Sequence, residues 1–358
     1  MKPKIVVATL IALTLAACGG GGNGSNTAST NSGSGSGSGS SGSTGGTITN
    51  CAIANTHPLI AIALTGGAGT AQFSNGGTTL AYSGNLSGTL SLVQDVNAPA
   101  PLNKACMDST GNSSTSMRTV MQSSGSLGIS HTLVSGADQP VLLMDSTALA
   151  ANSSLAVLQG TYTTLVYEND TSSTPAQNRM AYVTYTVDNA GNWSKCKNAP
   201  TCSTPTSSGT FAATAGSSNS FDVLSGGLLR AKAFIVGTGA NRILAVAETN
   251  NTGGGGVVSG IWLGVPQATW SPVVGSYALN TTDGTVNEVS ASLQNLIAGS
   301  QNHALTADTP ITGIASTTAS DGTINYLVAS PAGLLVTGNN TANNFANGPG
   351  YFSFGVMP

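Results

Sequence analysis

Short runs rich in Val, Ile, Thr, Tyr and Leu recur along most of the chain, and each is bounded by Gly, Asn, Asp or Pro. In several of them apolar and polar side chains alternate, as in Tyr-Val-Thr-Tyr-Thr-Val at 182–187. A period of two marks a β-strand with one face against a core. Helical spacing is rare: residues 289–298 are the best short candidate, and strand alternation explains them equally well. The strand-like runs are residues 78–83, 88–94, 126–135, 160–168, 181–188, 228–236, 241–248, 257–263, 324–330 and 351–356.

The turns between these runs favour antiparallel hairpins. Asn75-Gly76, Asp283-Gly284 and Asp321-Gly322 separate strand-like runs, and such pairs suit two-residue hairpin turns. Residues 188–192 (Asp-Asn-Ala-Gly-Asn) join two further runs in the same way. Parallel strands would need long, usually helical connections, which the pattern does not supply. We therefore predict an all-β fold, an antiparallel barrel or sandwich, because so many strands leave edges that must be covered.

Two pairs of similar segments bear on the number of β modules. Residues 157–162 (Val-Leu-Gln-Gly-Thr-Tyr) resemble 273–277 (Val-Val-Gly-Ser-Tyr), and 261–265 resemble 352–356, where an apolar strand closes on Gly-Val. These would be the first and last strands of two modules, with a joint near 267–272. Chance similarity in so restricted an alphabet explains them equally well. One module, two modules and an irregular propeller therefore remain open.

The first residues have the organisation of an export signal. Two lysines precede an uncharged apolar stretch at 5–15, and two alanines precede Cys18. The apolar stretch is too short to span a bilayer as a helix, which takes about 20 residues. Leu15-Ala16-Ala17-Cys18 resembles the lipobox of bacterial lipoproteins. The resemblance implies a signal peptide at 1–17, acylation of Cys18 and, because Gly19 rather than Asp follows, sorting to the outer membrane.

Residues 18–50 form a linker in this prediction. From Gly19 they contain only Gly, Ser, Asn and Thr with one Ala and one Ile, too little apolar surface to fold alone. A flexible coil of this length reaches about 30 Å. We predict a disordered tether that carries a β-rich body, 51–358, at the periplasmic face of the outer membrane or the cell surface. The lipobox, the tether and Trp193 shortly before a close cysteine pair are similar to uncharacterised β-rich lipoproteins of proteobacteria, a resemblance that implies no activity.

Acylation of Cys18 would leave four cysteines for disulfide bonds, and an even number is typical of an exported protein with two bridges. Three pairings exist. We favour Cys196–Cys202, which encloses a turn-like loop, together with Cys51–Cys106. A metal site is the alternative, but no Cys-x-x-Cys spacing is present, and we expect no metal.

Charged residues make up 6% of the chain, against about 25% in a typical soluble domain. After residue 17, eight Lys and Arg are set against thirteen Asp and Glu, a net charge of −5. Nucleic-acid binding requires a basic surface that neutralises phosphates, so this composition excludes it. A polybasic membrane contact is excluded for the same reason, which leaves the lipid anchor as the predicted route to the membrane.

Motifs that identify common enzymes and cofactor sites are missing from the sequence. It has no Gly-x-Ser-x-Gly, no His-Glu-x-x-His and no phosphate loop, and we expect no cofactor. Glu168 and Asp170 are the one close acidic pair, which reads most simply as a strand end and turn. The remaining candidates for acid–base chemistry are the three histidines and the other glutamates: His57, His131, His303, Glu248 and Glu288.

Aromatic residues are the best candidates for binding. Trp193, Trp262 and Trp270 could stack a sugar or an apolar ligand on a sheet face, although packing in a core is the commoner role of such residues. Tyr162, Tyr182 and Tyr185 could join them.

The predicted function is a non-enzymatic, outer-membrane-anchored β domain with a ligand-binding or envelope-structural role. Its partner would be a glycan or an envelope protein. The alternative is a glycan-active or other hydrolytic enzyme. Two carboxylates, or a histidine and a serine, brought together in a cleft would favour the enzyme. Aromatic side chains exposed on one face would favour binding.

Overall fold

The computed structural model describes residues 51–94, 105–109, 117–134, 137–171, 177–251, 257–282, 286–319, 322–340 and 351–358. The chain divides into two units, Met1–Thr47 and Ile48–Pro358, and all described residues belong to the second. The predicted signal peptide, acylated Cys18 and linker to residue 50 lie outside the described residues. So do Asp321 and the Asp283-Gly284 turn.

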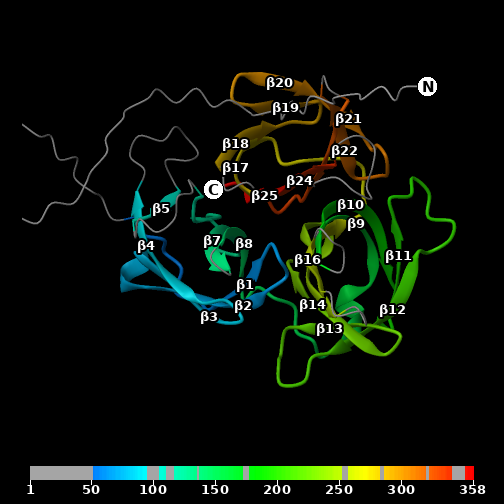
Figure 1. Ribbon diagram of the computed structural model, residues 1–358, viewed down its shortest axis with the longest axis horizontal. Coiled ribbons are helices and arrows are strands. Elements are labelled where there is room, and N and C mark those ends of the chain that lie inside the picture. Colours follow the sequence, from blue (N-terminus) through cyan, green and yellow to red (C-terminus); the bar gives the residue numbers. More distant parts are fainter. Residues whose placement is uncertain are drawn as a thin grey trace, which may run out of the picture. The chain divides into compact units, whose positions relative to one another are not determined.

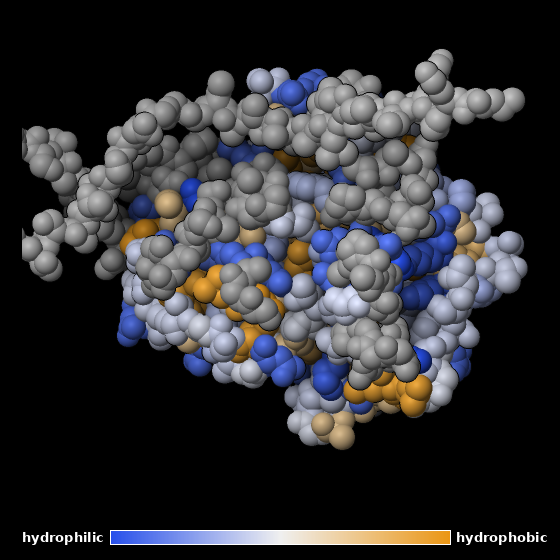
Figure 2. Space-filling model, in the orientation of Figure 1, coloured by the Kyte–Doolittle hydropathy of each residue, from blue (hydrophilic) through white to orange (hydrophobic). Residues whose placement is uncertain are grey.

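Every long element among the described residues is a β-strand, and helical turns there are short 3-10 segments. This confirms the predicted all-β fold. The strands form three antiparallel sheets that follow one another along the chain (Figure 1). Residues 289–298 fall largely in strands, so their alternation, and not their helical spacing, was the informative pattern. The surface drawn in Figure 2 mixes hydrophilic and weakly polar residues with small hydrophobic patches.

The first sheet has the strand order β5-β4-β3-β2-β1-β8-β7-β6. Its two edges meet, because Thr119 forms an isolated bridge to Cys106 of β5 with backbone hydrogen bonds of 2.8 and 2.9 Å. The predicted Asn75-Gly76 turn joins β2 to β3, and both residues have a positive φ. The strands are β1 (Leu59–Ala63), β2 (Ala68–Ser74), β3 (Thr79–Gly84), β4 (Gly88–Gln94), β5 (Cys106–Asp108), β6 (Val120–Met121), β7 (Leu127–Val134) and β8 (Ala137–Asp145).

The second sheet is a closed eight-stranded barrel. Its first and last strands, β9 and β16, pair from Asp170↔Val258 to Tyr162↔Pro266. The turn predicted at 188–192 joins β10 to β11, and Asp188 Oδ1 accepts the N–H of Ala190 and of Asn192 at 2.9 and 2.8 Å. The strands are β9 (Gly160–Asp170), β10 (Gln177–Val187), β11 (Asn192–Lys197), β12 (Ser207–Ala213), β13 (Phe221–Ser225), β14 (Leu228–Val236), β15 (Ile243–Asn251) and β16 (Val257–Pro266).

The third sheet has nine strands in the order β20-β19-β18-β17-β25-β24-β23-β22-β21. As in the barrel, its first strand, β17, pairs with its last, β25. The strands are β17 (Gly275–Thr281), β18 (Val286–Ala291), β19 (Asn295–Ala298), β20 (Gln301–Ala304), β21 (Thr306–Ala307), β22 (Ile314–Thr318), β23 (Ile324–Ala329), β24 (Leu334–Asn340) and β25 (Tyr351–Val356).

Both predicted disulfides are confirmed. Cys51–Cys106 links the first described residue to the edge strand β5, and Cys196–Cys202 closes the loop between β11 and β12. The partners are separated by 55 and 6 positions in the sequence, so loss of loop entropy in the unfolded chain would stabilise the fold by about 4 and about 2 kcal/mol, respectively.

Each sheet encloses an apolar core of its own, and a further core joins all three. Aromatic side chains connect the barrel to the nine-stranded sheet in this shared core: Tyr167 meets Phe352 and Tyr182 meets Tyr326, with ring centroids 5.8 and 5.5 Å apart. Strand β9 is consequently buried on both faces, since its alternate residues face the barrel interior and the shared core.

The two Gly-Thr/Ser-Tyr segments noted in the sequence have the same local structure. Gly160 and Gly275 begin β9 and β17 with φ of 151° and 155°, a region that favours glycine. The tyrosine two residues later donates its hydroxyl to the carbonyl four residues earlier in both, Tyr162 to Leu158 at 2.9 Å and Tyr277 to Val273 at 2.6 Å. Residues 267–272 lie between β16 and β17.

Candidate functional site

The interior of the barrel has an aromatic half and a charged half. Alternation along a strand fixes which residues face inward. On β9, Tyr162 and Val166 belong to the inner core, so Glu168 and Asp170 continue on the same face. On β11, Trp193 is in that core, and Lys195 and Lys197 continue from it.

Six charged side chains make up the charged half, here called the barrel charge cluster. Lys197 Nζ lies 2.5 Å from Glu168 Oε2, and Arg179 Nη1 lies 3.1 Å from Asp170 Oδ2. Both carboxylates are about nine-tenths buried. The cluster holds two of the three glutamates of the chain and three of the eight Lys and Arg that follow residue 17. Its members are Glu168, Asp170, Arg179, Lys195, Lys197 and Glu248.

Trp262 lies between the remaining two members of the cluster. Its Nε1 donates to Glu248 Oε2 at 2.8 Å, and Lys195 Nζ lies 3.9 Å from its ring centroid, a cation–π contact. Burial raises the pKa of Glu248 to about 7, and the charge of Glu168 adds to this while that of Lys195 opposes it. Burial also lowers the pKa of Lys195, against the charges of both glutamates. Glu248 can therefore gain or lose a proton near neutral pH.

A glycine stands between the two glutamates in one row across the barrel wall. Glu248 is opposite Gly260, Gly260 is opposite Glu168, and Glu168 is opposite Arg179, so the four residues form one row across β15, β16, β9 and β10. A Cβ at position 260 would stand 1.9 Å from the carbonyl oxygen of Tyr167. No side chain can therefore be placed there without movement of the backbone.

The structure brings two of the three predicted tryptophans together. Trp193 and Trp262 both face the barrel interior, where Tyr185 stacks on Trp193 with centroids 5.4 Å apart and meets Trp262 edge-on at 5.9 Å. Trp270 belongs to the core of the nine-stranded sheet. All three side chains are 5% exposed, so none offers an open stacking face. A role in ligand stacking stays a prediction, and only Trp193 and Trp262 could share it.

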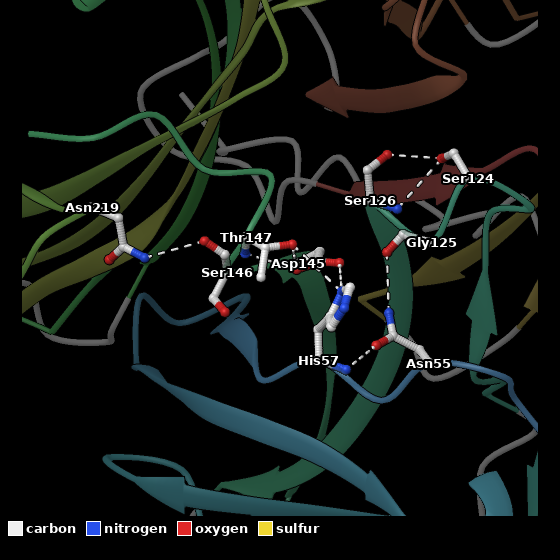
Figure 3. Close-up of polar contacts among 9 residues, drawn as sticks. All are labelled: Asn55, His57, Ser124, Gly125, Ser126, Asp145, Ser146, Thr147 and Asn219. Carbon is white, nitrogen blue, oxygen red and sulfur yellow. Dashed lines mark hydrogen bonds and ion pairs between the residues drawn. The ribbon is translucent and has the colours of Figure 1, made fainter.

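A second polar arrangement joins the segment before β1 to the end of β8 (Figure 3). His57 Nδ1 lies 2.8 Å from Asp145 Oδ2, and Asp145 Oδ1 accepts hydrogen bonds from the Thr147 hydroxyl at 2.7 Å and the Thr147 N–H at 2.8 Å. Burial alone would raise the pKa of Asp145, but these hydrogen bonds outweigh it and lower the pKa. Asn55 holds the segment in place, since it accepts the N–H of His57 and donates to the carbonyl of Gly125.

A histidine on a carboxylate resembles the base of a nucleophilic triad, which also needs a hydroxyl or thiol at the other ring nitrogen. Among the described residues, no such group is hydrogen-bonded to Nε2 of His57; Thr147 Oγ1 is 3.5 Å from Nδ1. Ser124 and Ser126 bond to each other at 2.8 Å (Figure 3). The His57–Asp145 contact therefore holds the segment before β1 against the end of β8, and no nucleophile of a triad accompanies it among the described residues.

The other predicted acid–base residues lie elsewhere. His131 Nδ1 is 2.9 Å from Asp138 Oδ1, with both side chains buried in the first sheet. His303 is in β20, and Glu288 is in β18. No group of three or more His, Cys, Asp and Glu side chains within the described ranges could hold a metal ion. The same ranges contain no helix with the length and hydropathy needed to cross a membrane.

The barrel charge cluster was not predicted as a unit. Glu168 and Asp170 were expected to mark a strand end and turn, and Lys195 and Lys197 were assigned no role. One signal was available: Trp193, Lys195 and Lys197 alternate on one short strand, which places two lysines on the same face as a tryptophan.

No protein-family model matches the chain, and no curated protein is similar to it. Among solved structures, the chain is similar to the crystal structure of the isotype 1 transferrin binding protein B from serogroup B Neisseria meningitidis, with 10% sequence identity and a TM-score of 0.22. The match covers 81% of this chain and 58% of that chain, so the chain spans less than two thirds of that protein's length. A TM-score this low does not define a common fold.

Proposed function

We propose that this protein is a lipid-anchored binding protein of the bacterial outer membrane, whose barrel of β9–β16 takes up a ligand without converting it. The barrel charge cluster carries the proposal. Moving charged groups from water into a protein interior costs several kcal/mol for each ion, even when they are paired. This chain has few charged residues and places six of them inside one barrel. Such a charged interior is suited to recognising a polar ligand.

The size of the barrel supports a small ligand or the end of a larger one. An eight-stranded barrel has an interior just wide enough for side chains or for one small molecule. The predicted partners, an envelope glycan or an envelope protein, would present a single sugar or a short chain terminus to such a site. The anchor at Cys18 and the tether of about 30 Å would keep the barrel within reach of both.

The binding role can be tested through the tryptophan side chains. Each of the three indole N–H groups gives one signal in a nitrogen–proton correlation spectrum, assigned by replacing each Trp with Phe. We expect a ligand in the barrel to shift the signals of Trp193 and Trp262 and to leave that of Trp270 unchanged. Neutral sugars, sugar acids, amino acids and short peptides would be added at millimolar concentration. If no class shifts the two barrel signals selectively, the binding role is wrong.

The anchor is tested separately. We expect Cys18→Ser to abolish acylation and cleavage, so that the precursor accumulates uncleaved. Labelling with a fatty-acid analogue and the mass of the protein would show both effects. Normal maturation of the variant would contradict the anchor and leave the binding role standing.

A hydrolytic enzyme is the second candidate, and one observation favours it. Glu248 has a pKa raised to about 7, and the neighbouring Glu168 is paired with Lys197. Two carboxyl groups with different environments are the requirement for an acid and a base or nucleophile in glycoside hydrolysis. Hydrolysis of aryl glycosides by the purified protein would support this function if both Glu248→Gln and Glu168→Gln abolished it. Equal residual rates in the wild type and both variants would exclude the pair as catalytic.

A further inference from the structure

Three neighbouring strands place polar side chains in one row inside the barrel. Tyr185 on β10 is directly opposite Lys195 on β11, and Lys195 is opposite Ser207 on β12. Trp193 lies two residues before Lys195 on the same face of β11. These four residues are called the donor set, because each carries an N–H or O–H group that faces the barrel interior.

The polar groups of the donor set lack partners among the residues that the structure describes. Tyr185 Oη, Trp193 Nε1 and Ser207 Oγ are buried without a hydrogen bond. Lys195 Nζ contacts the face of Trp262, and no acceptor in the described ranges bonds to it. The side chain of Tyr185 is 1% exposed and that of Trp193 5%, so bulk water does not replace the missing partners.

Two similar groups of the barrel have partners, whereas Thr164 Oγ1 on β9 and, in the nine-stranded sheet, Trp270 Nε1 are also buried without one in the described residues. The indole of Trp262 donates to Glu248, and the hydroxyl of Tyr162 donates to Leu158. A buried donor without an acceptor destabilises a fold by more than a made hydrogen bond stabilises it. The donor set differs from the other unpartnered groups in that its residues are neighbours on β10, β11 and β12, so one acceptor placed among them could serve all four.

The charges around the donor set narrow the class of acceptor. The carboxylates of Glu168 and Glu248 already accept from Lys197 and Trp262. Lys195 is the cation of the barrel charge cluster without a hydrogen-bonded anion in the described residues. A carboxylate carries one negative charge and can accept about four hydrogen bonds, which matches one ammonium group and three neutral donors.

We propose that the donor set binds the carboxylate of a small organic acid inside the barrel. This inference rests on the proposed binding function and specifies the group that is recognised. Lys195 would supply the charge, while Tyr185, Trp193 and Ser207 would orient the two oxygens.

Matched acids and amides test the carboxylate directly. Acetate and acetamide, and glucuronate and glucuronamide, differ within each pair only in the charged group. We expect each acid to shift the indole signals of Trp193 and Trp262, and to bind about tenfold or more tightly than its amide, the factor expected for one charge-assisted hydrogen bond. Tighter binding of glucuronate than of acetate would indicate a glycan source, and the reverse a free organic acid; both support a carboxylate site.

Two variants with matched controls test the residues. Lys195→Met keeps a long side chain over Trp262 and removes the charge, so it should lower affinity for the acid to that for the amide. Lys232→Met removes a lysine from the same barrel, whose partner Asp222 lies at 3.1 Å and whose side chain is 43% exposed, and it should leave affinity unchanged. Tyr185→Phe should weaken binding about two- to tenfold, whereas Tyr162→Phe, whose hydroxyl is already bonded, should not.

Three outcomes would overturn the inference. Equal binding of acids and amides would show that the carboxylate is not the recognised group, while the proposal that the barrel binds a ligand would stand. Full affinity in both Lys195→Met and Tyr185→Phe would place the acid elsewhere. Absence of any shift with every probe, in a protein whose three indole signals have the dispersed chemical shifts of a folded chain, would overturn the inference and the proposed function together.

Discussion

The barrel and the nine-stranded sheet begin alike and differ in what they enclose. Both start with a glycine at positive φ and a tyrosine whose hydroxyl bonds four residues back, and in both the first strand pairs with the last. The nine-stranded sheet encloses apolar residues and Trp270. The barrel encloses a core that is richer in aromatic residues and, beyond it, six charged side chains. The same arrangement of first and last strands thus encloses an apolar interior in the nine-stranded sheet and a partly charged interior in the barrel.

In a β-rich chain without sequence motifs, the side chains that each sheet encloses indicate where a binding site can lie. Apolar contacts hold the interior of the nine-stranded sheet together. A sheet whose first strand pairs with its last therefore does not need buried charges for its stability. Buried charges stabilise a protein weakly compared with apolar residues of the same size. Their presence in the barrel and absence from the described interior of the nine-stranded sheet support the proposed binding role of the barrel.

The largest effect should come from emptying the apolar interior of the nine-stranded sheet. Tyr277 is completely buried there, and Tyr277→Ala should lower the free energy of unfolding by about 3–5 kcal/mol, the range for buried aromatic residues. Urea denaturation measures the loss. Ligand-induced shifts of Trp193 and Trp262 should persist in the folded fraction. If this variant abolished binding while it stayed folded, the two interiors would not be functionally separate.

The next effect is specific to the barrel and depends on pH. The folded pKa of Glu248, about 7, exceeds its ordinary value of 4.5, so the folded state holds this proton more tightly than the unfolded state. Stability from this group is present at low pH and is lost as pH rises from 4.5 to 7, by on the order of 3 kcal/mol. Wild type and Glu248→Gln should therefore differ in the pH dependence of their free energies of unfolding.

Glu288 in the nine-stranded sheet provides the control for that measurement. Burial raises its pKa as well, but the residue is only partly buried. Glu288→Gln should leave most of the pH dependence in place. An equal flattening by both substitutions would mean that the buried carboxyl of the barrel is not distinctive.

The smallest effects compare three tyrosine hydroxyls. Tyr162→Phe and Tyr277→Phe each remove a hydrogen bond to a backbone carbonyl and should cost about 1 kcal/mol in the free energy of unfolding. Tyr185→Phe removes a hydroxyl without a partner among the described residues, so in the absence of ligand it should be neutral or slightly stabilising. Thermal unfolding of the three variants side by side would reveal a hidden partner of Tyr185 if all three lost the same stability.

Much of the fold could be predicted from the sequence, because its signals are local. Alternation predicted the strands, Asn75-Gly76 and the 188–192 turn predicted two connections, and short spacing predicted Cys196–Cys202. The number of sheets could not be predicted, since closure of β9 on β16 depends on pairing between residues far apart in the sequence, from Asp170↔Val258 to Tyr162↔Pro266.

The site could not be predicted for a related reason. Strand β9 is buried on both faces, so apolar and polar positions do not alternate there and nothing local tells which face looks into the barrel. The contact between His57 and Asp145 joins residues 88 positions apart. Only the folded barrel brings Glu168, Lys195 and Glu248 within range of one another.

The disulfide between Cys51 and Cys106 has a mechanical consequence. Any pull that arrives through the residues before Cys51 reaches a covalent branch point, and the sulfur bridge carries the load directly to β5. Strands β1 to β4 lie within the covalent loop that the disulfide closes, so the tension bypasses them. The backbone hydrogen bonds between Cys106 and Thr119 lie next to the point where the load enters. Tension on the chain before Cys51 would therefore enter the first sheet at the place where its two edges meet.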